Sequence, residues 1–253
     1  MIRVECDNNV AQIVLSRPEK LNAMDRSFWG NLRSALHWIA DQDIRAIIFT
    51  GEGERAFSVG GDIASFAELE TAGDRRAFQI EAMEAFDAVA RSPLPRIAAV
   101  NGLALGGGCE LAMACDFVLA ARSAVFGLPE ARFGLVPGYG ILAAPAIVGV
   151  QMAKLMILTG ETLTADEALK FGLTQKVCDD EALNGEALRL ARKMAETSPH
   201  AITAAKAILG RQIGAEEVAE SVEIVSRLHA TAESRKAVLL FLEQHRSMKR
   251  GER

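Results

Sequence analysis

The chain has 253 residues, of which half are hydrophobic, and its formal net charge is −5. This length and composition are typical of a folded protein with a large core, and they exclude a largely disordered chain. Acidic and basic residues are interspersed along the chain, so the charge pattern does not indicate a nucleic-acid surface.

The spacing of the cysteines and histidines predicts neither a disulfide framework nor a metal site. The cysteines contain no C-x-x-C pair and are typical of reduced, mostly buried thiols in a cytoplasmic protein. The histidines lack the spacing of metal ligands, so no metal cofactor is expected. These residues are Cys6, Cys109, Cys115 and Cys178, and His37, His200, His229 and His245.

No targeting or membrane-spanning segment is expected. Glu5 and Asp7 interrupt the apolar stretch that a signal peptide would need. The longest apolar region, residues 97–121, contains Glu110, Asp116 and four glycines. It therefore predicts a buried core and not a membrane span.

The N-terminal part of the chain predicts strands and helices in alternation. Residues 2–6 and 10–15 indicate two strands of a hairpin, joined at residues 7–9. Asp25 is a suitable N-cap for an amphipathic helix that reaches Gln42. A short buried strand is expected at residues 46–50.

A glycine pair follows in the segment AFSVGGDI, residues 56–63. Gly60 and Gly61 would let the backbone turn so that its N–H groups face outward. The same residues are also consistent with an ordinary turn in which Asp62 caps the next helix.

The central part of the chain joins a predicted strand to a glycine-rich turn and a helix. A helix at residues 74–92 is stopped by two prolines, and residues 97–100 form the next expected strand. Gly106-Gly107-Gly108 then leads into a short helix that carries Glu110. Backbone N–H groups at such a helix start favour developing negative charge.

Twenty positions later, a second glutamate lies in an apolar, glycine-rich setting. A strand is expected at residues 117–121, and Phe126-Gly127-Leu128-Pro129 delivers Glu130. Two such carboxylates beside backbone donors would suit general acid–base catalysis. A tight turn and solvated glutamates would give the same pattern. GLALGGG lacks the G-x-G-x-x-G spacing, so no nicotinamide site is expected.

The remaining sequence predicts helices. Their expected ranges are 152–159, 165–171 with Thr164 as N-cap, 181–197, 201–209, 215–231 and 234–245. Strands that alternate with helices and then give way to helices predict an α/β core of residues 1–197 and a C-terminal helical region of residues 198–253.

Several segments together resemble the crotonase superfamily, which is the enoyl-CoA hydratase/isomerase family. The segments are AFSVGGDI, AVNGLALGGGCELAMACDF, FGLPEARFGLVPG, RPEKLNAM and LTGETLTADEALKFGLTQKV. The resemblance runs from about residue 10 to residue 245. It implies a crotonase-like (ClpP/crotonase) α/β fold of repeated ββα units in two roughly perpendicular sheets. It also implies a C-terminal helical region used in trimerisation, and a homotrimer or a dimer of trimers.

The resemblance further implies that water adds to a trans-2-enoyl-CoA to give a 3-hydroxyacyl-CoA. The oxyanion hole would use the backbone N–H groups of Val59 and Gly107, and the catalytic pair would be Glu110 and Glu130. One glutamate must be protonated and the other ionised, and the sequence does not say which. Acyl-CoA would be the substrate, no cofactor would be required, and neither a membrane nor a nucleic acid would be a partner.

The resemblance also implies where acyl-CoA is bound. The expected CoA contacts are Lys20, Leu21, Ala23, Ala56, Gly60, Gly61, Asp62 and Phe241, with Arg246 close by. Lys20 is equally consistent with a solvated loop lysine. The expected acyl pocket is Leu128, Pro137, Gly138 and Tyr139. After Gly138 the chain has YGILAAPAIVG in place of the common Gly-Gly-Thr-Gln-Arg-Leu-like segment, which leaves the acyl preference open.

Four other functions are compatible with the resemblance. They are double-bond isomerisation, hydration or dehydration of a specialised acyl-CoA such as a carnitine-derived one, thioester hydrolysis, and non-catalytic binding of acyl-CoA or RNA. The acidic balance disfavours RNA binding, and the presence of both glutamates disfavours an inactive relative.

Overall fold

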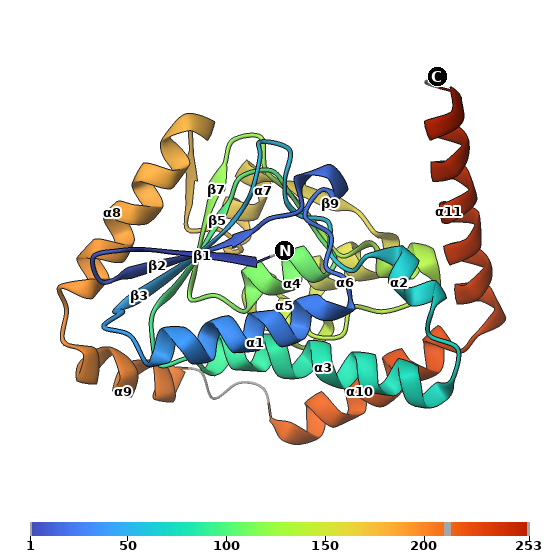
Figure 1. Cartoon of the computed structure of the whole chain (residues 1–253), viewed down its shortest axis with the longest axis horizontal. Helices are drawn as coiled ribbons and strands as arrows, with labels where there is room; N and C mark the ends of the chain where they lie inside the picture. Colours follow the sequence, from blue (N-terminus) through green and yellow to red (C-terminus); the bar gives the residue numbers. More distant parts are fainter. Residues whose placement is uncertain (1, 210–213, 252–253) are drawn as a thin grey trace.

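The computed structural model describes residues 2–209 and 214–251, which form two β-sheets surrounded by helices (Figure 1). The larger sheet has the order β1-β2-β3-β5-β7-β10, and the smaller one has the order β4-β6-β8-β9. The larger sheet consists of β1 Ile2–Asp7, β2 Val10–Leu15, β3 Ala46–Gly51, β5 Arg96–Val100, β7 Phe117–Ala121 and β10 Lys176–Cys178. The smaller sheet consists of β4 Ala56–Ser58, β6 Leu103–Leu105, β8 Val125–Gly127 and β9 Thr162–Thr164.

The larger sheet is mainly parallel. Only its first pair, the predicted hairpin β1–β2, is antiparallel, with Ile2 opposite Leu15 and Asp7 opposite Val10. The strands β2, β3, β5, β7 and β10 then pair in parallel. Parallel strands are covered on both faces, so their sequences are continuous apolar runs. For this reason β3, β5 and β7 could be predicted correctly from the sequence.

Helices cover the sheets and fill most of the remaining chain. The α-helices are α1 Arg26–Ala40, α2 Ile63–Ala67, α3 Ala72–Arg91, α4 Gly107–Met113, α5 Gly140–Val148, α6 Val150–Thr159, α7 Ala165–Lys170, α8 Leu183–Ala195, α9 Pro199–Leu209, α10 Ala215–His229 and α11 Ala232–Gly251. The 3-10 helices are η1 Pro18–Lys20, η2 Pro129–Phe133 and η3 Asp180–Ala182.

The predicted helix starts follow from capping side chains. The Asp25 carboxylate accepts the Ser27 N–H at the start of α1, and Thr164 caps α7 in a capping box, as predicted. Helix α3 begins earlier than the expected residue 74, because Thr71 and Asp74 form a capping box. Helices α1 and α3 lie side by side along one side of the molecule, and α10 packs on α3 (Figure 1).

Several short elements escaped prediction. Strands β4, β6, β8, β9 and β10 have three residues each, which is too few for a periodic pattern to emerge. The apolar segment after Pro137 was expected to be a turn followed by buried chain, and it contains helix α5. In the described residues after Cys178 no strand follows.

Helix α9 is attached to the larger sheet by a partly buried group of charges. The guanidinium of Arg96, whose side chain is 4% exposed, pairs with Asp116 at 2.5 Å, and Lys206 of α9 pairs with Asp116 at 2.6 Å. Burial opposes ionisation of Asp116, but the two cations outweigh it, so the pKa of this carboxyl is lowered. The carboxylate thus holds two cations in place.

Replacing Asp116 with alanine is expected to destabilise the protein by about 3–5 kcal/mol, because it leaves the buried Arg96 charge without its partner. Urea denaturation measures this loss. The matched control is Asp179→Ala, which removes an exposed ion pair with Arg122 and is expected to cost less than about 1 kcal/mol. Equal losses in the two variants would contradict a structural role for the buried group.

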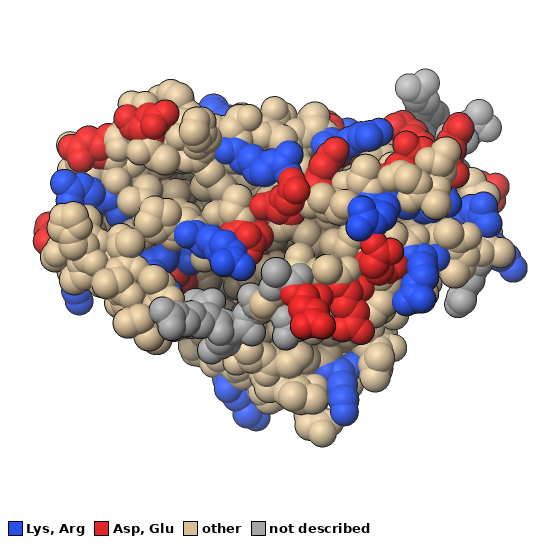
Figure 2. Space-filling model, turned by 90° about the horizontal axis from the view of Figure 1, so that it is seen from below, with Lys and Arg blue, Asp and Glu red and all other residues tan. Residues whose placement is uncertain are grey.

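The surface carries both signs of charge. Figure 2 shows Lys and Arg side chains mixed with Asp and Glu over the face seen from below. Among the described residues, no helix combines the length and the hydropathy needed to cross a membrane.

Candidate active site

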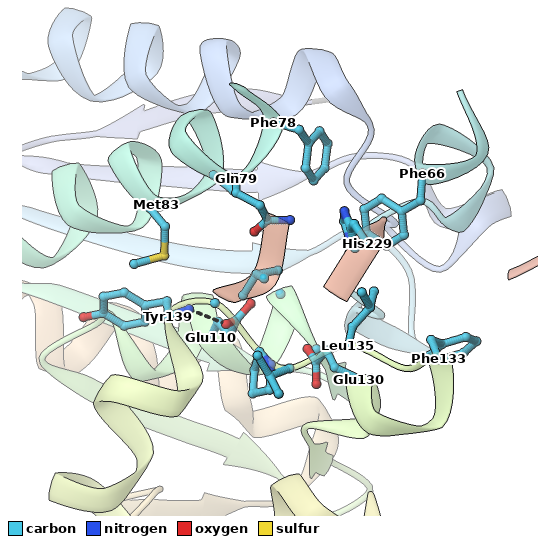
Figure 3. Close-up of a pocket in the computed structure, with 18 of the residues that line it drawn as sticks. Phe66, Phe78, Gln79, Met83, Glu110, Glu130, Phe133, Leu135, Tyr139 and His229 are labelled. Atoms are coloured by element: carbon cyan, nitrogen blue, oxygen red, sulfur yellow. Dashed lines mark hydrogen bonds between the residues drawn. The ribbon is translucent and has the colours of Figure 1, made fainter. Parts of the chain in front are cut away.

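One cavity of about 110 Å³ lies between the N-terminal end of α4, helix α3, the segment after η2 and helix α10 (Figure 3). Both predicted glutamates, Glu110 and Glu130, line it, and so do Gly61, Gly106 and Gly107. The sheets bring these residues together because β4, β6 and β8 are parallel neighbours in the smaller sheet. The residues that follow these strands therefore meet at one edge of that sheet.

Glu110 lies in the first turn of α4 and is buried, with 6% of its surface exposed. Its Oε1 atom accepts the backbone N–H groups of Tyr139 and Gly140, each at 2.7 Å. Burial raises the pKa of this carboxyl overall, and the two N–H donors offset part of that rise. Since N–H donors stabilise the charged form, the structure provides for an ionised carboxylate inside an apolar wall.

Glu130 lies in η2, directly after β8, and has a different environment. Its Oε2 atom is buried and has no hydrogen-bond partner among the described residues. Its pKa is raised well above the usual value for glutamate, by burial and by the negative charge of Glu110. The structure therefore favours a protonated Glu130 beside an ionised Glu110, which is the separation that an acid–base pair needs.

Two glycines allow close approaches of the backbone at the site. Gly106 has φ +50°, and a Cβ at this position would lie 2.9 Å from Oε1 of Glu130. Gly60 has φ +85°, and its Cβ would lie 2.7 Å from the amide nitrogen of Gly107. Both the positive φ and the close approach require glycine.

The prediction that Val59 supplies an oxyanion-hole donor is wrong in this geometry. The Val59 N–H donates to the Leu21 carbonyl at 3.2 Å. Along the same turn, the Gly60 N–H donates to Ser58 Oγ and the Asp62 N–H donates to the Met24 carbonyl. The physical reason is that residues 59–62 pair with residues 21–24, and this pairing uses the Val59 N–H.

Gly61 is the residue of this turn whose N–H has no acceptor among the described residues. A Cβ on Gly107 would lie 3.7 Å from the Gly61 nitrogen, so the two residues are close neighbours. The Gly107 N–H belongs to the first turn of α4 and has no partner within the helix. Gly61 and Gly107 thus lie close together in the lining of the cavity, and the oxyanion-hole role of Gly107 stays a prediction.

Replacing Gly108 with alanine is expected to destabilise the protein by roughly 1–3 kcal/mol, because the new Cβ would lie 2.1 Å from the Ser58 carbonyl oxygen. The start of α4 would have to move. Gly30→Ala in α1 is the control, since its Cβ would meet no atom within 4 Å; a gain of up to about 1 kcal/mol is expected there. Urea denaturation that ranks the two variants in the opposite order would contradict this packing.

The segments predicted to contact CoA run side by side. The Met24 N–H donates to the Gly60 carbonyl at 2.8 Å, and Asn22 Nδ2 donates to the Ala56 carbonyl at 2.8 Å. Leu21 lies at the C-cap of η1 with φ 52°. Lys20 is exposed, whereas Ala23 and Ala56 are buried. Asp62 caps α2, which is the alternative that the sequence left open, and also pairs with Arg17.

The C-terminal helix α11 approaches this region. The ring of Phe241 packs against that of Phe133 in η2, with 5.6 Å between the ring centroids. The side chain of Arg246 lies outside the described residues. Among the described residues, no group of three His, Cys, Asp or Glu side chains could hold a metal ion.

Three of the four residues predicted for the acyl pocket line the cavity: Pro137, Gly138 and Tyr139. The Tyr139 ring packs on Phe86 with 5.5 Å between centroids, and burial raises the pKa of its hydroxyl to about 12. The prediction for Leu128 was wrong, because this residue does not line the cavity. It is fully buried and packs against Gly140: a Cβ added to Gly140 would lie 3.1 Å from Leu128 Cδ2.

Among the cavity residues that the sequence analysis missed are two polar ones, Gln79 of α3 and His229 of α10. A signal was present for each. Gln79 shares a helix face with the buried Met83 and Phe86, and His229 continues the buried stripe of Val222 and Val225. A polar residue on an apolar helical face is the pattern that could have found them.

Comparisons with known proteins agree on one family. A family model described as enoyl-CoA hydratase/isomerase matches residues 5–249. The short-chain-enoyl-CoA hydratase of Clostridium acetobutylicum is 34% identical over 96% of this chain and 95% of that protein. The crotonyl-CoA hydratase of Syntrophomonas wolfei is 34% identical over 97% and 96%. A solved enoyl-CoA hydratase/isomerase structure from Mycobacterium paratuberculosis matches with a TM-score of 0.88, at 31% identity over 94% of this chain and 97% of that one.

Proposed function

The chain belongs to the enoyl-CoA hydratase/isomerase family, and on this basis we propose that it is an enoyl-CoA hydratase with a crotonase-like fold. The enzyme adds water to a trans-2-enoyl-CoA and forms a 3-hydroxyacyl-CoA. One observation carries the proposal: Glu110, Glu130 and the backbone of Gly61 and Gly107 line the same cavity.

The first role is to polarise the thioester. Its carbonyl oxygen accepts the N–H groups of Gly61 and Gly107, which stabilise the negative oxygen that develops as water adds to the double bond. Donors that are fixed before the reaction act strongly in a site that excludes water. The start of α4 adds the positive end of the helix dipole.

The glutamates supply the base and the acid. The ionised Glu110 takes a proton from a water molecule, whose oxygen bonds to Cβ. The protonated Glu130 gives its proton to Cα, so that the elements of water are added to the double bond. Proton exchange then returns each carboxyl to its starting state. The raised pKa of Glu130 and the N–H donors on Glu110 support this assignment.

Acyl-CoA is the substrate in this proposal, and neither a metal nor a nicotinamide takes part. The chain's own groups can supply the acid, the base and the oxyanion site. The paired segments at residues 20–24 and 56–62 hold the CoA portion. We also propose a cytoplasmic location, which the absence of disulfides among the four cysteines supports.

The wild-type protein is expected to remove the ultraviolet absorbance of enoyl thioesters in a chain-length series of trans-2-enoyl-CoAs. Mass spectrometry is expected to find a product one water heavier than the substrate. An isomer of unchanged mass would indicate double-bond migration instead, and released free CoA would indicate hydrolysis. Either result in place of hydration overturns the proposal.

The proposal includes a homotrimer or a dimer of trimers. Helix α6 supports an association of chains, since Val150, Leu155 and Leu158 are 53%, 43% and 72% exposed. Such apolar surface commonly marks an interface. Light scattering after size exclusion is expected to give three or six times the chain mass of 27.2 kDa. A monomeric mass at micromolar concentration would contradict it.

A further inference from the structure

The wall of the cavity beyond the two glutamates is mainly apolar, with polar atoms on the side chains of Trp29, Gln79, Tyr139 and His229. Its apolar side chains include Phe66, Phe78, Met83, Phe86 and Leu135. Gln79 and His229 interrupt it, and each is 7% exposed (Figure 3). Because the glutamates and the paired amides fix the thioester and its double bond, this wall surrounds the part of the acyl chain beyond Cβ.

Gln79 places an amide in the cavity, close to the segment that binds Glu110. Figure 3 shows its side chain pointing from α3 into the cavity. A Cβ on Gly138 would lie 3.5 Å from Oε1 of Gln79, and Gly138 directly precedes Tyr139, whose N–H binds Glu110. No described residue forms a hydrogen bond with the Gln79 side chain. An acyl chain that buries this amide without offering it a hydrogen bond would bind more weakly, because an unpaired polar group is costly to bury.

His229 adds a second uncharged polar group. Burial, together with the positive charge of Arg75, lowers its pKa to about 4, so the imidazole is neutral near pH 7. Its ring packs on Phe66 with 5.1 Å between centroids, and no described residue forms a hydrogen bond with its nitrogens. A neutral imidazole offers one donor and one acceptor, and an amide offers both kinds as well.

The charges of the wall limit what these groups can bind. Among the described residues that line the cavity there is no Lys or Arg, and the two acids are the catalytic glutamates. A carboxylate on the acyl chain would therefore be buried without a counter-ion and beside a negative charge, which is unfavourable. A hydroxyl or carbonyl oxygen would satisfy the amide without this penalty.

We propose that Gln79, assisted by His229, selects acyl chains that carry an uncharged oxygen, as a hydroxyl or carbonyl group, beyond Cβ. This inference rests on the proposed hydratase function. It makes Gln79 a specificity-determining residue: a chain without the oxygen encloses the amide unpaired, whereas a chain with it forms the hydrogen bond.

The test compares hydration of trans-2-hexenoyl-CoA with that of its 5-hydroxy, 6-hydroxy and 5-oxo derivatives. In the wild type, kcat/KM is expected to be about tenfold or more higher for at least one oxygenated chain than for the plain chain. In Gln79→Leu this ratio is expected to fall to about one or below. The ratio is taken within each variant, so a partly unfolded preparation does not affect it. Gln42→Leu, at an exposed position of the surface, is the control and should keep the wild-type ratio.

The outcomes separate this inference from the proposed function. Efficient hydration of the plain chain, with no oxygenated derivative preferred and no change of ratio in Gln79→Leu, overturns the inference and leaves the hydratase function in place. Absence of hydration for every chain overturns the proposed function and the inference with it. A ratio that falls equally in Gln42→Leu also overturns the inference, because the effect would not belong to the cavity.

Discussion

Replacing Glu130 with glutamine is expected to lower kcat for hydration by about 10²- to 10⁴-fold, since it removes the carboxyl that gives its proton to Cα. Glutamine has nearly the same shape, so the cavity is expected to remain intact. The measurement is the initial rate of loss of enoyl-thioester absorbance under saturating substrate. Turnover at the wild-type rate would remove Glu130 from the mechanism.

The thermal stability of the same variant serves as a control on folding, because the direction of its change in Tm can be predicted. Because burial and the charge of Glu110 raise the pKa of Glu130, the folded protein retains a proton that the unfolded chain loses. Wild-type stability contributed by this group therefore falls as pH rises above the ordinary glutamate pKa. Glu130→Gln lacks this loss. Its Tm is expected to exceed that of the wild type near pH 8, with a difference that shrinks toward about pH 4. A lower Tm at both pH values would instead indicate damaged packing.

Replacing Glu110 with glutamine is expected to lower kcat by about 10²- to 10⁴-fold as well, through loss of the base that activates water. The side-chain oxygen of glutamine can still accept the Tyr139 and Gly140 N–H groups, so the fold around α4 is expected to persist. The pH profile separates the two glutamates. Wild-type activity should fall at low pH as Glu110 gains a proton, and at high pH as Glu130 loses its proton.

Each variant should lose one side of this bell-shaped profile. The residual activity of Glu110→Gln should lack the acidic fall, and that of Glu130→Gln should lack the alkaline fall. Burial raises the pKa of both carboxyls, so both falls should lie above the usual glutamate range. The apparent values belong to the interacting pair. Exchanged profiles would reverse the roles of acid and base.

Much of the fold could be predicted because its core elements are long and strongly patterned. The hairpin β1–β2, the buried strands β3, β5 and β7 and the capped helices α1 and α7 all follow from local chemistry. The three-residue strands of the smaller sheet could not be predicted in this way. They exist because tertiary pairing holds them, and no periodic pattern fits within three residues.

In the site, too, some residues could be predicted from the sequence and others could not. Glu110 and Glu130 could be found because a family motif marks them. The motif could not show that Gly61, and not Val59, has the amide that is free among the described residues, since the Val59 N–H is taken by the Leu21 carbonyl of a segment distant in sequence. Leu128 was misplaced for a related reason: a residue next to a functional motif can point into the core behind it.

The donors inferred for the reaction all belong to the peptide backbone, at Gly61, Gly107, Tyr139 and Gly140. Mutation exchanges side chains but leaves peptide N–H groups in place, except where proline enters. Side chains of helix α3 and of residue 139 can therefore change without removing these four donors, so that only Glu110 and Glu130 must be kept as side chains for the chemistry. A family built in this way can diversify its substrates without first losing its reaction.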